Sequence, residues 1–450
     1  MGSIWKSQRI AEEARERGVR SEAQGGSRFK RLVEVSQMVI AVSCVGVFFN
    51  AGTSAAAQNL CVDPSNTPKC SATIQDAVDL AKKNAVITVV AGTFFENVVI
   101  NTGMAPKKLN LVIQGAGVGS TIVDGGSAGI VFTVGRKAAL TLANMTIQHG
   151  ENTASQGLGG GVSAVGTKLT IQDCEINDNV VTDGGGGGVG VEAGPLNVIN
   201  STVRDNNASG GGGLFFASAK KTATISDSTF RDNLANEGGG ILIGGLAKAT
   251  IRNSTIDDNQ AAEVGLSPAI GGGIFVDGKS VTILDSTISD NLARTDQPMA
   301  SHGGGICNLN STVTLNNVTV ADNAASVGGG IDTQASMSFI TSGNSIIADN
   351  RATVSSADCA GNVKSTGYNL ILDPSGCGVS GKTSTDIISE DPILADLAPN
   401  PPGMTDTQAL GAGSPALEKG NPGAPEATAC RPISVAYDDP PASAISGPSS

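Results

Sequence analysis

The sequence predicts an all-β protein, a right-handed single-stranded parallel β-helix (a solenoid) with a short N-terminal capping helix. The first observation is a sevenfold internal repeat, with a period of roughly 25 to 32 residues, that runs from Gly159 to Asn350. The second is that each unit opens with three glycines and closes with an Asp-Asn pair. The third is the apolar–polar alternation between them, as in KLTIQDCEI, TATISDSTF and KATIRNSTI. A fixed period of this kind is typical of a solenoid, and alternation with period 2 is typical of strands.

The repeat also predicts what the corners of each coil do. Glycine clusters suit bends that need a positive φ or a close approach of neighbouring coils. An Asn that recurs at one corner can stack its amide on the next coil, where it would satisfy buried polar groups. Alternation then turns the preceding Asp outward. The ladder consists of Asn179, Asn206, Asn233, Asn259, Asn291, Asn323 and Asn350.

The flanking segments divide the chain further. Residues 1–57 have basic residues before the apolar stretch Met38 to Phe49, the order of a secretory signal peptide with a long n-region. Residues 58–85 form an N-terminal cap, in which Thr73 starts a helix that covers the open end of the solenoid. The parallel β-helix then occupies residues 86–375. Residues 376–432 form a C-terminal cap, and residues 433–450 a disordered tail rich in Ser and Pro.

Charge and the N-terminal pattern narrow the partners and the compartment. The first 57 residues hold eight basic and five acidic side chains, so the rest holds 21 and 36, a formal net charge of −15. Such acidity disfavours nucleic acid as a partner. We expect a secreted protein, or one of the bacterial cell envelope or surface. It should be a monomer with no membrane span once the signal is removed.

The cysteines fit an oxidising compartment. Cys61 with Cys70, and Cys359 with Cys377, are close in sequence and predict two disulfides. Cys174 and Cys307 lie in distant coils and should stay unpaired, since about five strand spacings exceed disulfide reach. The sequence assigns no partner to Cys430. Without a C-x-x-C pair or a His cluster, no metal site is predicted.

Three stretches carry a resemblance to known families. The run CSATIQDAVDLAKKNAVITVVAGTFFENVVI, with LVIQGAGVGSTIVDG and LTLANMTIQHG, resembles bacterial secreted β-helix proteins of the pectate-lyase-like superfold. The GGGI and DN units resemble polymorphic outer-membrane protein repeats. The segment DCAGNVKSTGYNLILDPSGC, with EDPILADL and GAGSPALEKG, resembles the choice-of-anchor group. Together these matches cover about Cys61 to Gly420. The resemblance implies the fold and secretion and says little about activity.

One candidate surface is the column of corner aspartates. Seven like charges about 5 Å apart repel one another unless water or a cation separates them. We expect a solvated acidic column and no cofactor, with calcium bridging as the alternative. A position repeated in every coil singles out no catalytic site. The column consists of Asp178, Asp205, Asp232, Asp258, Asp290, Asp322 and Asp349.

A second candidate is a pair of longer corners in consecutive coils, Gln260 to Ile270 and Leu292 to His302. Insertions at one corner of adjacent repeats stack and often mark a binding face. A third long corner, Gly150 to Leu158, follows a histidine. Variable surface loops are the alternative interpretation of all three. The binding residues predicted at the paired corners are Glu263, Arg294, Asp296 and His302.

Two classes of function remain open. The first is a secreted or cell-surface protein that binds or adheres without catalysis, with an extracellular polysaccharide or a host or cell-surface ligand as partner. The second is a polysaccharide lyase or glycoside hydrolase, for which an inverting hydrolase would need two carboxylates about 6.5 to 9.5 Å apart. The sequence favours the first class because it holds one Trp and two Tyr. A sugar-processing groove commonly stacks sugar rings on such residues.

Overall fold

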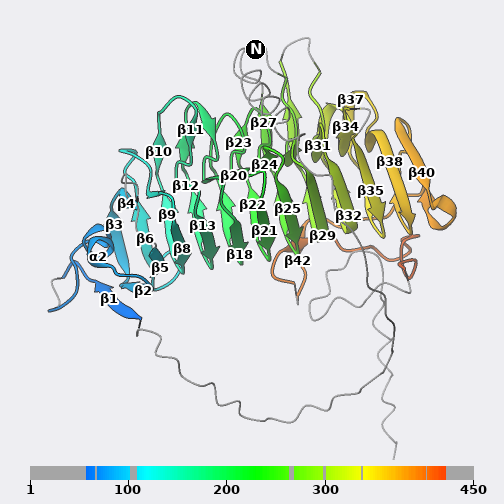
Figure 1. The fold of residues 1–450 in the computed structure, drawn as a ribbon. Helices are drawn as coiled ribbons and strands as arrows, with labels where there is room; N and C mark the ends of the chain where they lie inside the picture. Colours follow the sequence, from blue (N-terminus) through cyan, green and yellow to red (C-terminus); the bar gives the residue numbers. More distant parts are fainter. Residues whose placement is uncertain are drawn as a thin grey trace, which may run out of the picture. The chain divides into compact units, whose positions relative to one another are not determined.

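Successive turns of the chain place strands that pair in parallel with those of the turns before and after, so the coils stack along one axis (Figure 1). The computed structural model describes residues 57–65, 68–101, 109–262, 268–296, 300–335, 338–401 and 403–421. The predicted signal peptide, Glu263, Cys430 and the predicted tail lie outside them. Within the described ranges 32 strands form one continuous sheet. The prediction of an all-β parallel β-helix is confirmed.

The first face, here called sheet A, takes two strands from each coil. A residue with positive φ, such as Asp227 or Asn253, separates the two. The two strands are continuous in β29 (Ser280–Ser289) and β32 (Thr312–Ala321). The first strands are β1 (Gln58–Val62), β2 (Ala85–Val89), β5 (Leu109–Gln114), β8 (Ala138–Ala143), β13 (Lys168–Gln172), β18 (Leu196–Ile199), β21 (Thr222–Ser226), β25 (Lys248–Arg252), β35 (Phe339–Gly343), β38 (Cys359–Gly367) and β40 (Cys377–Gly381). The second strands are β3 (Gly92–Phe95), β6 (Thr121–Asp124), β9 (Thr146–Gln148), β14 (Glu175–Asn177), β19 (Thr202–Arg204), β22 (Thr229–Arg231), β26 (Thr255–Asp257), β36 (Ile346–Ala348), β39 (Leu370–Ile371) and β41 (Ile387–Ile388).

Two further faces close each coil. Sheet B follows the glycine triplets and consists of β4 (Val98–Ile100), β7 (Phe132–Val134), β12 (Val162–Val165), β17 (Val189–Glu192), β20 (Leu214–Ala217), β24 (Ile241–Gly244), β28 (Ile274–Val276), β31 (Ile306–Asn308), β34 (Ile331–Thr333) and the start of β38. Sheet C follows the ladder asparagines and consists of short strands, β10 (Glu151–Asn152), β15 (Val180–Val181), β23 (Leu234–Ala235), β27 (Gln260–Ala262), β30 (Leu292–Arg294), β33 (Ala324–Val327) and β37 (Arg351–Ser355), with the pair β11 (Gly157–Leu158) and β16 (Gly184–Gly185) at the next bend.

The core is a narrow aliphatic column between these faces. In β25 the pattern is exposed, buried, half-buried, buried, exposed, so Ala249 and Ile251 point inward and Thr250 points outward. The same alternation recurs in the neighbouring coils, and Ile225, Ile251 and Ile283 stack in register with no exposed surface. Burial of each such side chain contributes roughly 1.5 to 3 kcal/mol.

The predicted asparagine ladder is present. Asn259 Nδ2 donates to Asn291 Oδ1 at 2.9 Å and to the Phe230 carbonyl at 2.8 Å, and Asn291 Oδ1 also accepts from Asn259 N at 3.1 Å. All seven ladder asparagines are at most 6% exposed, whereas Asp258 before Asn259 is exposed. The corner aspartates all have φ between 53° and 60°. Asp tolerates this region better than most residues, which explains its place there.

The glycine triplets fit tightly against this ladder. Gly238, the first of its triplet, has a φ of +64°, which favours glycine. A Cβ on Gly240, the third, would lie 2.8 Å from the Gly273 carbonyl oxygen and 3.0 Å from the Asn259 amide. The two sequence signals of the repeat, glycine triplet and Asn, therefore meet in space and depend on each other.

Both ends of the described stack differ from the regular coils. Helix α2 (Ile74–Leu80) buries Ile74, Ala77 and Val78, and Thr73 caps it by accepting a bond from Asp76 N, as predicted. At the other end a 3-10 turn, η1 (Thr383–Thr385), precedes β41. The chain then returns along sheet A, where β42 (Ala398–Pro399) and β43 (Asp406–Thr407) pair in antiparallel fashion; the orange β42 marks this return in Figure 1.

The cysteine predictions are confirmed. Cys61 pairs with Cys70 and Cys359 with Cys377, with Cα–Cα distances of 4.7 and 5.1 Å. Cys174 and Cys307 are free and buried. Burial raises the pKa of the Cys174 thiol to about 12 and that of Cys307 well above its usual value. Both thiols therefore behave as small apolar groups.

Candidate functional site

The predicted corner residues are only partly brought together. Arg294, at the end of β30, lies 3.4 Å from Asp296 between Nη2 and Oδ2, and both side chains are largely exposed at 59% and 79%. Glu263 lies outside the described residues. The two long corners do stack on each other at their start, because β27 and β30 pair in register and place Gln260 beside Leu292. An exposed ion pair of this kind contributes little to stability.

His302 has a different partner from the one the sequence suggested. Its Nδ1 lies 2.7 Å from Oδ2 of Asp332, the middle residue of β34, whereas Arg294 pairs with Asp296. Asp332 is 7% exposed and His302 28%. Gln334 Nε2 donates to the same Asp332 oxygen at 3.3 Å. The imidazole thus belongs to the outer surface of sheet B, beside a small apolar cluster that includes Phe275 and Cys307.

A column of threonines runs along the outer surface of sheet A. Thr250 pairs with Thr224 on one side and with Thr282 on the other. Each of these three side chains is half-buried and flanked by two inward apolar residues. Because parallel strands are about 4.8 Å apart, the column repeats its hydroxyl and methyl groups at that interval. The outward threonine column consists of Thr141, Thr170, Thr224, Thr250, Thr282, Thr314 and Thr341, with Asn197 between the second and third.

A trough of about 290 Å³ lies on the same face at the first coils. Thr141 and Thr170 of the column form part of its floor, together with the outward Val86 and Val112. Polar groups line its margin, where Asn110 Nδ2 donates to Asn84 Oδ1 at 2.7 Å and where Lys168 is exposed. The trough therefore combines an apolar floor with amide, hydroxyl and ammonium groups at its edges.

Charged residues interrupt the repeat on the second strands of sheet A. Arg204 and Arg231 pair in register on adjacent coils. Arg204 forms ion pairs with Glu175 of the previous coil and with its own corner residue, Asp205. Arg231 Nη2 lies 3.0 Å from Oδ2 of Asp257 on the next coil. At the same position other coils carry Phe95, Asp124, Gln148, Asn177, Ser289, Ala321 and Ala348.

Asp257 is the most perturbed carboxyl of this cluster. Its side chain is 1% exposed, and neither oxygen accepts a hydrogen bond from the described residues, because the Arg231 nitrogen approaches off the hydrogen-bond direction. Burial raises the pKa of Asp257 to about 7. Arg231 opposes the rise, and the negative charges of Asp258, Asp232 and Asp406 add to it. A carboxyl with such a pKa can exchange a proton near neutral pH.

Most residues of the acidic column are exposed, and some have partners, as Asp205 has in Arg204 and Asp322 in Gln408. Asp178, Asp205, Asp232, Asp258 and Asp290 are exposed. Burial and the neighbouring corner carboxylates raise the pKa of Asp232, Asp290 and Asp349. Among the described residues no three His, Cys, Asp or Glu side chains are placed to hold a metal ion together.

The sequence contained a signal for the outward threonine column, although the predicted site lay at the corners. In K-L-T-I, T-A-T-I and K-A-T-I the Thr stands between two residues that must face inward, so alternation places it outside in these coils. The Arg231–Asp257 pair carried no such signal. These residues belong to adjacent coils, 26 residues apart, and their burial depends on the returning C-terminal segment.

Comparison with known proteins identifies the family. The chain belongs to the family of the right-handed β-helix region, whose model matches residues 111–269 and 213–391, more than half of the chain. Pectate lyase Pel9A is a similar solved structure, with 13% identity over 80% of this chain and 91% of that one and a TM-score of 0.43.

Two further solved structures are similar. Pectin methylesterase from carrot has 12% identity over 74% of this chain and 91% of that chain, with a TM-score of 0.35. The A-module of the mannuronan C-5 epimerase AlgE4 of Azotobacter vinelandii has 14% identity over 70% and 91%, with a TM-score of 0.29. No curated protein matches this chain by sequence. Structural similarities with identities and TM-scores this low carry no information about what the chain binds or catalyses.

The disulfides bear on the compartment of the protein. The two disulfides are compatible with an extracellular protein. The only α-helix within the described residues has seven residues, and no described helix is long and apolar enough to cross a membrane.

Proposed function

We propose that the protein is a secreted or cell-surface β-helix that binds an extended neutral polysaccharide along the outer surface of sheet A, without catalysis. The observation that supports this most is the alignment of the trough with the outward threonine column, since Thr141 and Thr170 belong to both. A polymer lying along the column would meet the same groups on each coil. The finer resemblance to choice-of-anchor proteins and polymorphic outer-membrane repeats is part of this proposal.

Charge favours a neutral polymer over a polyuronate. The chain beyond residue 57 has a formal net charge of −15, and the acidic column lies at the edge of the same sheet. A polyanion would approach against this charge at low ionic strength. Lys168 at the trough is one ammonium group and does not offset it.

The shortage of aromatic side chains determines how strongly each sugar unit can bind. Without aromatic stacking, each sugar would make only hydrogen bonds and methyl contacts, which are individually weak. Repetition over many coils can still give a useful affinity, because each further contact is intramolecular once the first is made. The affinity should therefore rise steeply with the length of the polymer.

Affinity gel electrophoresis of the full chain tests this proposal, with gels that contain dextran, a soluble β-glucan or polygalacturonate, with and without calcium. We expect retardation by a neutral glucan and none by polygalacturonate. Thr141→Arg with Thr170→Arg should weaken binding at least about tenfold, or 1.4 kcal/mol. Thr133→Arg is the matched control, because Thr133 is a half-buried outward residue of β7 in sheet B. Equal loss in the control, or retardation only by polygalacturonate, contradicts the proposal.

The second candidate function, a polysaccharide lyase or hydrolase, is favoured by one observation. Asp257 and Arg231 put a carboxyl with a pKa of about 7 beside a guanidinium on the same sheet. Such a pair could move a proton to or from a glycosidic oxygen. Incubation with the same polysaccharides, followed by assays for reducing ends and for unsaturated products, separates the two functions. Products that disappear in Asp257→Asn would replace the binding proposal by an enzymatic one.

A further inference from the structure

The C-terminal segment after the last coil covers one part of sheet A and leaves another open. This segment, residues 390–421 and here called the strap, is described apart from residue 402. Thr255 Oγ1 donates to the Asp406 carbonyl at 2.6 Å, and Thr405 Oγ1 donates to the Asn253 carbonyl at 3.3 Å. These contacts place β43 against the coil of β26, about 150 residues earlier in the sequence.

The other end of the strap is held by apolar packing. Ala416 is buried against Ile346, Ala348 and Leu370, with Leu394 and Leu410 packed on the same cluster. From β9 onwards, these outward positions are apolar only in the last coils, where the strap lies. The two ends of the contact therefore differ in kind, since the end at β36 is apolar and the end at β26 is polar and charged.

The strap determines which outward threonines of the second strands reach solvent. Thr202, Thr229, Thr255, Thr287 and Thr319 form one column in register. The first two are half-buried, whereas Thr255, Thr287 and Thr319 are 0%, 3% and 3% exposed. The strap thus covers three coils of a surface that is open in the two preceding coils.

Asp257 stands at the polar end of this contact. It lies two residues after Thr255 on the same outward side of β26, and it is 1% exposed. The charged groups that face it are Arg231 of β22, the corner residues Asp232 and Asp258, and Asp406 of the strap. On the next coil its register partner is the neutral Ser289. One positive and three negative groups therefore surround a buried carboxyl without a hydrogen bond.

We propose that Asp257 is a proton-controlled latch for the strap, which docks firmly at β43 while this carboxyl is protonated and loosens when it ionises. The neutral carboxyl costs far less to bury under the strap than the carboxylate does. The carboxylate needs water, and it is repelled by Asp406 of the strap and by the corner residues, against one attraction from Arg231. Release of the strap hydrates Asp257 and separates it from Asp406.

Proton binding by Asp257 determines whether docking of the strap strengthens or weakens as the pH rises. The docked state holds the Asp257 proton up to a pH of about 7, where burial sets its pKa, while a hydrated carboxyl loses it near its ordinary value. Docking is then favoured at low pH and weakens as the pH rises. The equilibrium between docked and open strap changes by at most about tenfold per pH unit, the limit for one linked proton. The latch does not depend on which ligand the outer surface of sheet A binds.

Hydrogen exchange of the full chain from pH 5.5 to 8.5, corrected for the intrinsic rates, measures this latch. Peptides that contain residues 403–410 should lose protection as the pH rises to about 7 and should change little above it. In Asp257→Asn the protection should stay high and independent of pH. Asn already occupies the equivalent position 177, so this variant is compatible with the coil. Peptides from the apolar end, around Ala416, should change less.

Two controls make the test decisive. Asp178→Asn changes a corner aspartate remote from the strap and should leave the pH dependence as in the unaltered chain. Asp406→Asn removes the repulsion from the strap, which lowers the pKa of the docked Asp257 carboxyl, so the loss of protection should be smaller and should level off at a lower pH. Protection at residues 403–410 that is flat with pH in the unaltered chain, or equally pH-dependent in Asp257→Asn, overturns the proposal.

Discussion

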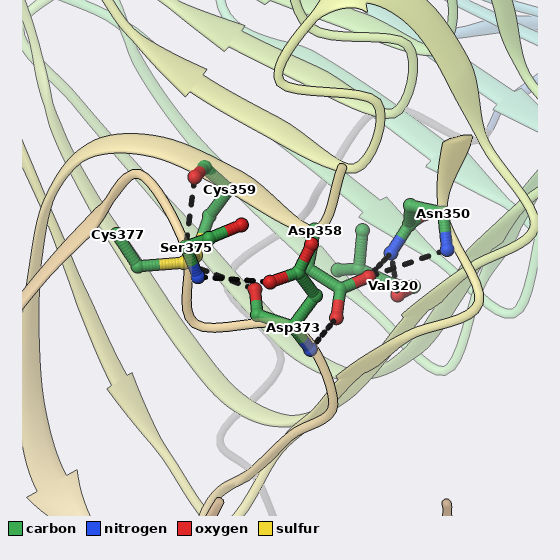
Figure 2. Close-up of a disulfide and its surroundings, with 7 residues drawn as sticks. All are labelled: Val320, Asn350, Asp358, Cys359, Asp373, Ser375 and Cys377. Atoms are coloured by element: carbon green, nitrogen blue, oxygen red, sulfur yellow. Dashed lines mark hydrogen bonds between the residues drawn. A yellow bond between two sulfur atoms is a disulfide. The ribbon is translucent and has the colours of Figure 1, made fainter. Parts of the chain in front are cut away.

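Asn350 Nδ2 donates to Oδ1 of Asp358 at 2.9 Å, so a carboxyl group ends the ladder of seven asparagines (Figure 2). The same oxygen accepts from Asn350 N at 3.2 Å, and Asp358 Oδ2 accepts from Asp373 N at 2.7 Å. The neighbouring Cys359 is bonded to Cys377. The last regular coil therefore ends in a buried acceptor, held where the next asparagine of the repeat would be.

The ladder predicts unequal costs at two adjacent positions. Asn259→Ala should lower the free energy of unfolding by on the order of 1 to 3 kcal/mol, because the Phe230 carbonyl and the Asn233 amide lose a buried partner. Asp258→Ala should lower it by less than about 0.5 kcal/mol, since that side chain is exposed. Urea denaturation of both variants checks this, and equal losses would mean that the two positions are not inward and outward as described.

Asp358 predicts a pH dependence of stability. Burial raises its pKa to about 6, against hydrogen bonds from Asp373 N and Asn350 that lower it. A carboxyl whose pKa is raised on folding stabilises the folded state most below its unfolded pKa, near 3.9, and this contribution is lost as the pH rises to about 6. The loss should be on the order of 3 kcal/mol, since each unit of pKa difference corresponds to about 1.4 kcal/mol.

The measurement is urea denaturation at several pH values between 4 and 7, on the unaltered chain and on Asp358→Asn. Other buried carboxyls, Asp257 among them, add to the pH dependence of both proteins. The difference between the two proteins therefore isolates Asp358. It should favour the unaltered chain more at pH 4 than at pH 7, and a difference of the opposite slope would contradict the raised pKa.

The free thiols predict selective chemical labelling. Cys174 and Cys307 are 2% and 0% exposed, and burial raises the pKa of both, so few thiolates form and reagents cannot reach them. Iodoacetamide at pH 8 should modify neither in the folded chain and both in urea. Rapid modification of Cys307 in the folded protein would show that the surface of sheet B opens.

The sequence predicted the features that repeat, and it missed those that depend on contacts between distant coils. The ladder of Asn259 and its neighbours followed from a period alone, as did the outward Asp258. The pairing of His302 with Asp332 did not, because it depends on which residue of the next coil lies under the corner. The return of the strap to Thr255 likewise had no local signal, since Asp406 is 151 residues away.

The paired corners predict a simple response to shortening. Reducing Gln260–Ile270 and Leu292–His302 to the short corner of the other coils should change stability little, because the cost of a loop varies slowly with its length. Under the present proposal it should also leave polysaccharide binding intact, since the trough is lined by the early coils of sheet A. Affinity electrophoresis of the shortened chain checks this. Loss of binding would instead indicate that the binding site lies at the corner residues Arg294, Asp296 and His302.

A hydrogen-exchange footprint of the full chain, saturated with the neutral glucan that retards it most, tests whether sheet A carries the binding surface. We expect added protection in peptides from β5, β8 and β13, which contribute Val112, Thr141 and Thr170 to the trough. We expect no change in peptides from the corner at residues 292–302. Protection confined to that corner, with sheet A unchanged, would show that the binding surface lies elsewhere.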